Sequence, residues 1–392
     1  MGDALLKHLD LDERRLLVEL QSLGVTVQDE RVGAARGGAF AGRRGGAGPS
    51  DALFMWVRGL PLTVPWQAGY VDRSPYTVHL TDGGGTLYRG EELIGPVKLP
   101  RRPRIYDMTT ADGTPYWRIA LLHLDSIAST VVQKCIYWGT AEQCGFCGIE
   151  LTRGEQTIPV KTPAQLAEVC TAARDHDGAV DVTLTTGSIN RRDRGALYIS
   201  RCAAAIKDAC GLPVQVQFEP PDDDSVLDTV RDAGVDAVGI HIETFDPDVL
   251  AGVAPGKAQC GVEGYFRCWE RAVEVFGRGR VTTYVILGMG EDPALIEDGC
   301  RRAIELGVYP FVVPLRPVPG TLMASTPPPP ADYVGSIYRS VSAMLAESGL
   351  DHVEAKAGCA RCQACSGLSA WERVFKREEA RARDELPIYG RG

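Results

Sequence analysis

An alternation of strand-like and helix-like segments begins near residue 126 and constrains the fold of this chain more than any other feature. The strand candidates cover residues 128–134, 181–187, 214–219, 236–243, 281–288 and 309–315. The helix candidates cover residues 163–176, 194–209, 223–233, 262–276, 292–306 and 331–347. Because consecutive parallel strands need a crossover connection, six such units in order predict an α/β fold whose parallel sheet curls into a partial (β/α)6 barrel.

The residues before this alternation predict an accessory region of a different kind. Leucines at helical spacing indicate an amphipathic helix over residues 3–24. Residues 53–105 alternate apolar and polar side chains between turn signals, which predicts short β-strands. The glycine- and arginine-rich stretch 33–48 is interpreted as a structural or lid loop, because no lysine–threonine pair of a P-loop follows it.

Three regions therefore make up the expected organisation. Residues 1–120 form an N-terminal α+β accessory region, residues 121–350 form the barrel, and residues 351–392 form a tail that contains cysteines. The stretch Pro327–Pro330 is a stiff stop before the last predicted helix.

Composition restricts the compartment and the partners. The chain has 392 residues, of which 44% are hydrophobic, and a formal net charge of −9, so a nucleic-acid surface is not expected. It has no signal-peptide h-region and no run of 18 apolar residues, so neither secretion nor a membrane span is predicted. Twelve cysteines in such a chain indicate a reducing, cytoplasmic setting with metal or cluster ligands.

Six of the cysteines fall into two clusters, and the first is Cys135, Cys144 and Cys147, spaced C-x8-C-x2-C after the first predicted barrel strand. Three thiolates in one loop suit a cubane 4Fe–4S cluster with one iron left open for a substrate or cofactor. A zinc site and plain buried thiols are the alternatives. The six cysteines outside the two clusters lie mostly in helical patterns and are interpreted as small buried hydrophobic residues.

The motif Cys144-Gly145-Phe146-Cys147 and the barrel pattern together resemble the radical S-adenosylmethionine (SAM) superfamily. The commonest triad in that superfamily is C-x3-C-x2-C, so the longer first gap here is a departure. The resemblance implies a radical SAM barrel, a 4Fe–4S cluster on the triad, SAM with Phe146 beside it, a small-molecule substrate and an electron donor such as flavodoxin or ferredoxin. The chain, including residues 42–50, also resembles a bacterial radical SAM group encoded beside nitrilases.

Polar residues and glycines stand at the ends of the predicted strands, where barrels carry their chemistry. The set consists of Thr186, Gly187, Glu219, Glu243, Gly288, Gly290 and Arg316. A carboxylate such as Glu219 or Glu243 can accept hydrogen bonds from an ammonium group or from ribose hydroxyls.

The resemblance gives the other strand-end residues roles toward SAM. It implies that Thr186 and Gly187 stand where the methionine amino group is held. It also implies that the Gly288-Met289-Gly290-Glu291 turn approaches the adenine. Arg316, at the end of the sixth predicted strand, is expected to pair with the SAM carboxylate through its guanidinium. His241, beside Glu243, is interpreted either as a packed, hydrogen-bonded histidine or as a base.

The second cluster is Cys359, Cys362 and Cys365, spaced C-x2-C-x2-C in the tail. Four interpretations stay open: an auxiliary iron–sulfur cluster, a structural metal site with His352 as fourth ligand, a trithiolate pocket for a thiophilic acceptor, and three reduced cysteines without a ligand. We expect the tail to fold over the mouth of the barrel, because about 10 extended residues, roughly 33 Å, would reach it.

These features give three functional hypotheses. The first is a radical SAM enzyme that cleaves SAM reductively to make a carbon radical for the modification of a small molecule. The second follows from the wide gap in the triad, which is similar in spacing to diphthamide-type enzymes: transfer of the 3-amino-3-carboxypropyl arm of SAM to a thiophilic acceptor such as trivalent arsenic. The third is a non-catalytic iron–sulfur or zinc redox module.

Overall fold

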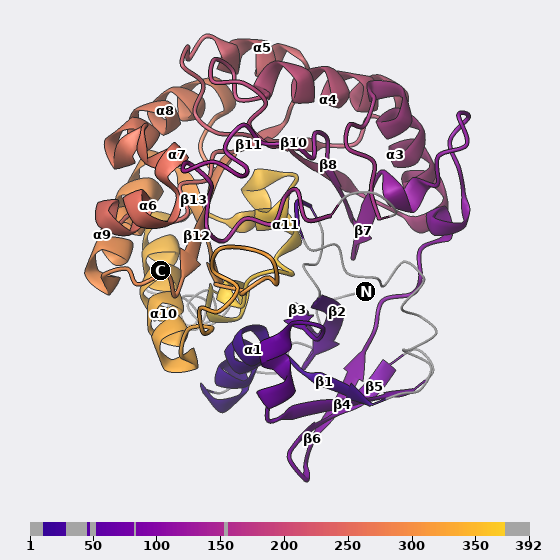
Figure 1. Ribbon diagram of the computed structural model, residues 1–392, viewed down its shortest axis with the longest axis vertical. Coiled ribbons are helices and arrows are strands. Elements are labelled where there is room, and N and C mark those ends of the chain that lie inside the picture. Colours follow the sequence, from indigo (N-terminus) through magenta and orange to yellow (C-terminus); the bar gives the residue numbers. More distant parts are fainter. Residues whose placement is uncertain (1–10, 29–44, 48–51, 82–83, 153–155, 373–392) are drawn as a thin grey trace, which may run out of the picture.

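The structure is a computed structural model that describes residues 11–28, 45–47, 52–81, 84–152 and 156–372. Two β-sheets organise the described residues, a sheet of seven strands and a sheet of six strands. In Figure 1 the seven-stranded sheet curves inside an arc of helices, and the six-stranded sheet lies below its open side.

The larger sheet has the strand order β13-β12-β11-β10-β9-β8-β7. Its strands are β7 (Leu121–His123), β8 (Ser126–Thr130), β9 (Asp181–Thr185), β10 (Val214–Gln217), β11 (Ala237–Gly239), β12 (Val281–Leu287) and β13 (Val308–Pro314). Strands β8 to β13 pair in parallel in sequence order, and β7 joins the edge as an antiparallel partner of β8. The prediction of a mixed α/β fold with a curled sheet is confirmed.

Helices follow the parallel strands and cover the outer face of the curled sheet (Figure 1). They are α3 (Pro163–Asp177), α4 (Ala196–Cys210), α5 (Val226–Asp232), α6 (Pro247–Val253), α7 (Pro255–Ala258), α8 (Gly261–Phe276), α9 (Pro293–Leu306) and α10 (Ala331–Ser348). Local signals fix several of their starts: Thr162 and Gln165 form a capping box before α3, and Asp292 caps α9. None of the described helices combines the length and apolar character that crossing a bilayer requires.

The sequence did not predict the pair α6–α7, which lies between β11 and α8. Asp246 caps α6, and a proline begins each of the two helices. Each helix is too short to show a full hydrophobic period, which explains the omission. The same reason applies to β7, whose three residues pair with β8 across a turn in which Leu124 has a φ of 60°.

The accessory sheet has the order β1-β4-β5-β6-β2-β3. It is built from β1 (Thr26–Gln28), β2 (Ala52–Val57), β3 (Leu60–Pro65), β4 (Tyr76–Thr81), β5 (Gly84–Arg89) and β6 (Glu92–Lys98), preceded by α1 (Leu11–Leu23). Short 3-10 helices complete the described elements: η1 (Gly69–Arg73), η2 (Arg104–Asp107), η3 (Tyr116–Arg118) and η4 (His352–Ala355). The first part of the predicted helix 3–24 and most of the predicted loop 33–48 lie outside the described residues.

The tail enters the barrel from the end opposite to the one we expected. Its short helix α11 (Cys359–Cys362) carries Arg361, which forms ion pairs with Asp181, the first residue of β9, and with Asp125, just before β8. Both carboxylates mark the amino-terminal ends of the strands. The expectation that the tail covers the mouth is therefore wrong. The length of the chain limits only how far from the last barrel helix the tail can extend. The ion pairs of Arg361 with Asp181 and Asp125 place the tail at the amino-terminal ends of the strands.

Candidate functional site

One cavity of about 380 Å³ lies inside the curled sheet, and both cysteine clusters line it. Cys135, Cys144 and Cys147 reach it from the loop after β8, and Cys359, Cys362 and Cys365 reach it from the tail. The cavity also receives several of the predicted strand-end residues: Thr186, Gly187, Glu219, Glu243 and Arg316, together with Phe146. Segments more than 200 residues apart in the chain therefore share one interior space.

Residues just after β9 hold one side of the first cysteine loop. The Gly187 N–H donates to the Val132 carbonyl at 3.0 Å, and the Ile136 N–H donates to the Ser188 carbonyl at 2.8 Å. A Cβ at position 187 would lie 2.0 Å from the Lys134 carbonyl oxygen, so only glycine permits this approach. Gly187 therefore positions the loop that carries Cys135, in addition to lining the cavity.

The other side of the loop is held by segments that the sequence did not connect with it. The Gly145 N–H donates to the Val253 carbonyl at 2.6 Å, and the Gly256 N–H donates to the Glu142 carbonyl at 3.2 Å. The Met323 N–H donates to the Gly145 carbonyl at 3.0 Å. The helices α6 and α7 thus serve as a buttress for the loop between Cys135 and Cys147.

The chemistry of the first cysteine cluster fits an iron–sulfur cluster. Burial raises the pKa of all three thiols, for Cys147 to about 12, so their thiolates need a bound cationic centre to be stable. In the described part of the chain, no three His, Cys, Asp or Glu side chains are arranged around a single ion position. This holds for the tail cysteines as well as for the triad, so one ion bound by all three thiols of either cluster would require the side chains to move closer together.

A buried ion pair lines the same cavity as the triad, and the sequence predicted only one of its two residues. The Lys257 ammonium, from α7, is 2.5 Å from Glu243 Oε1 and donates to the His241 carbonyl at 2.9 Å. Their side chains are 10% and 9% exposed, so the two charges compensate each other inside the protein. Glu243 was predicted as a site residue, but Lys257 was missed because α7 carries no periodic signal.

Glu219 is tied to the same cysteine loop. Its carboxylate accepts from Ser188 Oγ at 2.6 Å and from the Tyr137 hydroxyl at 3.4 Å. Arg194 donates in turn to the Tyr137 hydroxyl at 2.8 Å. This network places one carboxylate in the cavity wall and links it to the residue two positions after Cys135.

Two of the predicted SAM contacts have other partners in the structure. Arg316 lines the cavity, but its Nη2 donates to the Thr63 carbonyl of β3 at 2.7 Å. The N–H groups of Gly288 and Met289 both donate to the Glu291 carboxylate at 2.7 Å. Gly288 and Gly290 are not among the described residues that line this cavity, so the structure does not bring the predicted adenine turn to it.

His241 has the environment of a packed, hydrogen-bonded histidine. Its Nδ1 accepts from the Tyr284 N–H at 3.1 Å, which leaves Nε2 as the protonated nitrogen of a neutral ring. Burial, reinforced by the charge of Lys257, lowers the pKa of His241 to about 3. The imidazole is therefore neutral at physiological pH, and of the two interpretations the structure supports the packed one.

The tail cysteines form the opposite wall of the cavity. Cys359 Sγ lies 3.6 Å from Gln217 Nε2, and Cys365 Sγ lies 3.7 Å from Thr63 Oγ1. Burial is the main cause that raises the pKa of Cys359, to about 12, and the neighbouring Cys365 acts in the same direction. His352 does not line the cavity in the described structure. Its Nδ1 lies 3.1 Å from Glu372 Oε2, so it does not join the trio.

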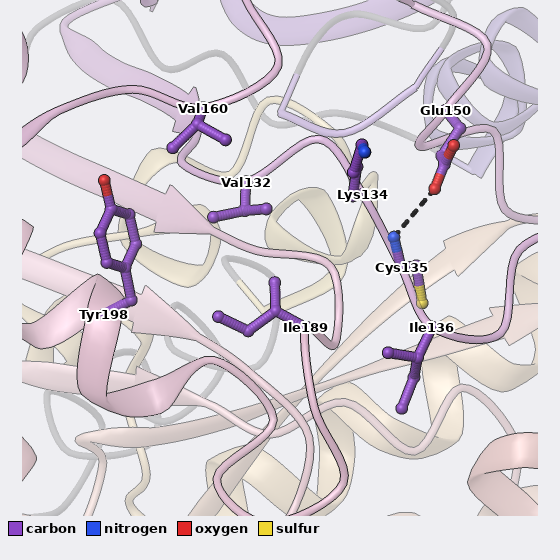
Figure 2. A pocket seen from close by; sticks show the side chains of 8 residues that line it. All are labelled: Val132, Lys134, Cys135, Ile136, Glu150, Val160, Ile189 and Tyr198. Carbon is purple, nitrogen blue, oxygen red and sulfur yellow. Dashed lines mark hydrogen bonds between the residues drawn. The ribbon is translucent and has the colours of Figure 1, made fainter.

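A second cavity, of about 550 Å³, shares Cys135 with the first, and Figure 2 shows the residues that line it. The side chains that line it are mainly apolar: Val132, Lys134, Cys135, Ile136, Glu150, Val160, Ile189 and Tyr198. The Glu150 carboxylate accepts from the Cys135 N–H at 3.0 Å, the dashed line in the figure. Cys135 therefore lines both cavities, which the sequence did not indicate.

Residues 139–301 match a protein-family model described as the Radical SAM superfamily. The matched segment includes Cys144 and Cys147 and begins after Cys135. Among curated proteins, the chain is similar to bacteriochlorophyllide c C-7(1)-hydroxylase of Chlorobaculum limnaeum, with 34% identity over 125 residues. That similarity covers 31% of this chain and 31% of the hydroxylase, so the chain matches less than a third of its relative's length.

Solved structures with a similar arrangement include two enzymes. Methylornithine synthase superposes with a TM-score of 0.45 and 14% identity, over 64% of this chain and 78% of that chain. A radical SAM methyltransferase from Sphaerobacter thermophilus superposes with a TM-score of 0.43 and 15% identity, over 69% of this chain and 75% of that chain.

Proposed function

Because residues 139–301 match the family model of the Radical SAM superfamily, we propose that this protein is a radical SAM enzyme that modifies a small molecule. A 4Fe–4S cluster would be held by Cys135, Cys144 and Cys147, and SAM would occupy the cavity beside it. The observation that carries this proposal is the shared cavity, which joins the three thiols of the triad to carboxylates at the carboxyl ends of β10 and β11.

The residues of the cavity suit SAM as a cationic ligand. Glu219 and Glu243 place two carboxylates in the wall, and carboxylates accept hydrogen bonds from ammonium and hydroxyl groups. Phe146 supplies an apolar surface and Thr186 a hydroxyl. When bound, the cluster would supply the electron for reductive cleavage of SAM. The three thiolates of the triad would hold three of its irons, which would leave the fourth open to a ligand.

The proposal includes an external reductant and a cytosolic setting. An electron donor such as flavodoxin or ferredoxin would reduce the cluster, and the cytosol keeps the twelve cysteines in the reduced state. A small molecule that shares this cavity with SAM is the proposed substrate.

Replacing Cys135, Cys144 and Cys147 together by alanine should remove the iron that this loop binds and abolish SAM cleavage. The measurement is iron and sulfide per chain after anaerobic reconstitution, followed by SAM consumption with dithionite. The exposed Cys260, which lies outside both clusters, gives a matched control, and Cys260→Ala should retain iron and SAM cleavage. Iron at the wild-type level after both cysteine clusters are removed would contradict the proposal.

The same experiment separates an enzyme from a redox module. A protein that loads iron and sulfide but leaves SAM intact in the presence of dithionite would be a non-catalytic iron–sulfur protein. A radical SAM enzyme consumes SAM under those conditions, and the cleavage products identify the carbon–sulfur bond that breaks.

The position of the tail cysteines favours a second, more specific candidate. Cys359, Cys362 and Cys365 line the same cavity as the first triad, so a soft atom held there would face the SAM site. In this candidate one electron from the reduced cluster would break the bond between the SAM sulfur and its 3-amino-3-carboxypropyl arm, with 5′-methylthioadenosine as the leaving group. The arm would bond to a thiophilic acceptor such as trivalent arsenic, which would become pentavalent as the electron returns to the cluster. An auxiliary iron–sulfur cluster on the tail thiols is the competing use of the trio.

Changing Cys359, Cys362 and Cys365 together to serine should abolish product formation while SAM binding and the first cluster are retained. The physical reason is that hydroxyls bind soft atoms far more weakly than thiolates do. Loss of about half of the iron would indicate an auxiliary cluster. Arsenite that binds the wild type alone, with an aminocarboxypropyl product detected by mass, would indicate an acceptor pocket. Full activity in the serine variant would exclude both uses.

A further inference from the structure

Lys257 places a buried ammonium group in the wall of the cavity that the first cysteine triad lines. Gly256, the residue before Lys257, donates its N–H to the Glu142 carbonyl, and Glu142 lies two residues before Cys144. The short helix α7 therefore both carries the cation and contacts the loop of the triad. One buried cation is held in the same interior space as the three sulfur atoms.

The fold prevents this ammonium from moving to solvent. Lys257 Nζ is held by Glu243 Oε1 at 2.5 Å and by the His241 carbonyl at 2.9 Å. The preceding Gly256 packs so closely on the cysteine loop that a Cβ there would lie 2.9 Å from the Tyr137 ring and from the Glu142 carbonyl oxygen. The lysine and the loop are thus fixed to each other through adjacent backbone.

The charges around the triad oppose further reduction. Three thiolates, Glu219 and Glu243 are negative, and an electron added to a cluster there would increase the negative charge. A cation at short range in a water-poor interior stabilises the more negative state of its neighbour. The sign of the effect follows directly: the positive charge favours the reduced cluster, and the partner carboxylate opposes it.

We infer that Lys257 is a positioning residue that sets the reduction potential of the cluster, with Glu243 fixing the place of its charge. The inference rests on the proposed function, because it needs a cluster on Cys135, Cys144 and Cys147. In this inference the helix pair α6–α7, which the sequence did not predict, places one buried positive charge next to the cysteine loop.

The test is a redox titration of reconstituted protein without SAM, followed by the electron paramagnetic resonance signal of the reduced cluster. The tail variant Cys359/Cys362/Cys365→Ser serves as the parent, so that only one cluster contributes. Lys257→Met should make reduction harder by about tenfold or more in equilibrium constant, a shift of about 59 mV for a one-electron couple. Glu243→Gln should shift the potential in the opposite direction, and Lys257→Arg should retain the parent potential.

Lys134 provides a matched control, since it is an exposed lysine next to Cys135 in the sequence. Lys134→Met should leave the potential unchanged, because solvent screens an exposed charge. Damage to the fold would not give shifts of opposite sign in Lys257→Met and Glu243→Gln. If Lys257→Met fails to fold, the inference is decided by Glu243→Gln and by Lys257→Met/Glu243→Gln, which should return the potential toward that of the parent.

The outcomes separate this inference from the proposed function. A parent protein that loads no iron would overturn the proposed function and the inference with it. A parent that loads a reducible cluster, combined with unchanged potentials in Lys257→Met and Glu243→Gln, would overturn the role of Lys257 and leave the proposed function intact. Equal shifts in the same direction in both variants would also overturn it.

Discussion

Replacement of Arg361 by methionine is expected to lower the free energy of unfolding by about 3–5 kcal/mol at pH 8, because it leaves a buried carboxylate without its partner. The Asp181 side chain is 0% exposed, and the Arg361 guanidinium is its ion-pair partner. The same guanidinium reaches Asp125 Oδ1 at 2.5 Å, but that carboxylate is 50% exposed and has water as an alternative partner. Chemical denaturation of the reconstituted protein measures the loss.

The loss should depend on pH in a definite direction. Burial raises the pKa of Asp181 to about 6, even with Arg361 beside it. A carboxyl group whose pKa is higher in the folded state contributes stability that is complete below its unfolded value, near 3.8, and is lost as the pH rises through about 6. Without Arg361 this pKa rises further, so Arg361→Met should cost less at pH 5 than at pH 8.

Two controls test the cause of that loss. Asp125→Asn removes the half-exposed partner and should cost about 1 kcal/mol or less. The double variant Arg361→Met/Asp181→Asn removes both buried charges and should recover much of the lost stability. A cost below about 1 kcal/mol for Arg361→Met at pH 8 would show that the ion pair does not anchor the tail.

The second large effect is expected for Gly187→Ala, which should prevent the first cysteine loop from loading its iron. The new Cβ would lie 2.0 Å from the Lys134 carbonyl oxygen, and a backbone atom cannot move aside as a side chain can. To remove this steric clash, the backbone between Val132 and Cys135 would have to shift. We expect less than half of the wild-type iron per chain and a loss of about 1–3 kcal/mol or more in unfolding free energy.

Gly252 is a suitable comparison for this change. It lies inside α6, and nothing is within 4 Å of a Cβ added there. Gly252→Ala should therefore retain iron and gain up to about 1 kcal/mol from better helix propensity. Normal iron content and normal stability in Gly187→Ala would mean that the loop can approach β9 from a different position.

Long periodic elements could be predicted from the sequence because each carries its own signal. The run Val281–Leu287 is apolar and β-branched, and Pro293–Leu306 repeats its apolar residues at helical spacing, so both segments were located within two residues. The triad Cys135, Cys144 and Cys147 was equally accessible, since three cysteines in a short segment are a local pattern.

Features that depend on pairing between distant segments could not be predicted in this way. Lys257 becomes part of the site because α7 docks on the cysteine loop, and nothing in its own segment indicates a buried partner. Arg316 lines the cavity but also donates a hydrogen bond to a carbonyl of the accessory sheet. The rule that strand-end residues form the site does not predict this second contact. The side from which the tail enters depends on Asp181, a residue 180 positions before Arg361.

Thr63 of the accessory sheet contacts both the barrel and the tail, so the three regions cannot be separated without breaking these contacts. Its carbonyl accepts from Arg316 of the barrel, its N–H donates to the Ala364 carbonyl of the tail at 2.7 Å, and its hydroxyl lies 3.7 Å from Cys365 Sγ. One residue thus joins all three regions at the cavity wall. The barrel is accordingly not an interchangeable module: a fragment excised at the ends of its sheet would lose a wall of its own interior, and grafting it onto another accessory region would have to recreate this three-way joint.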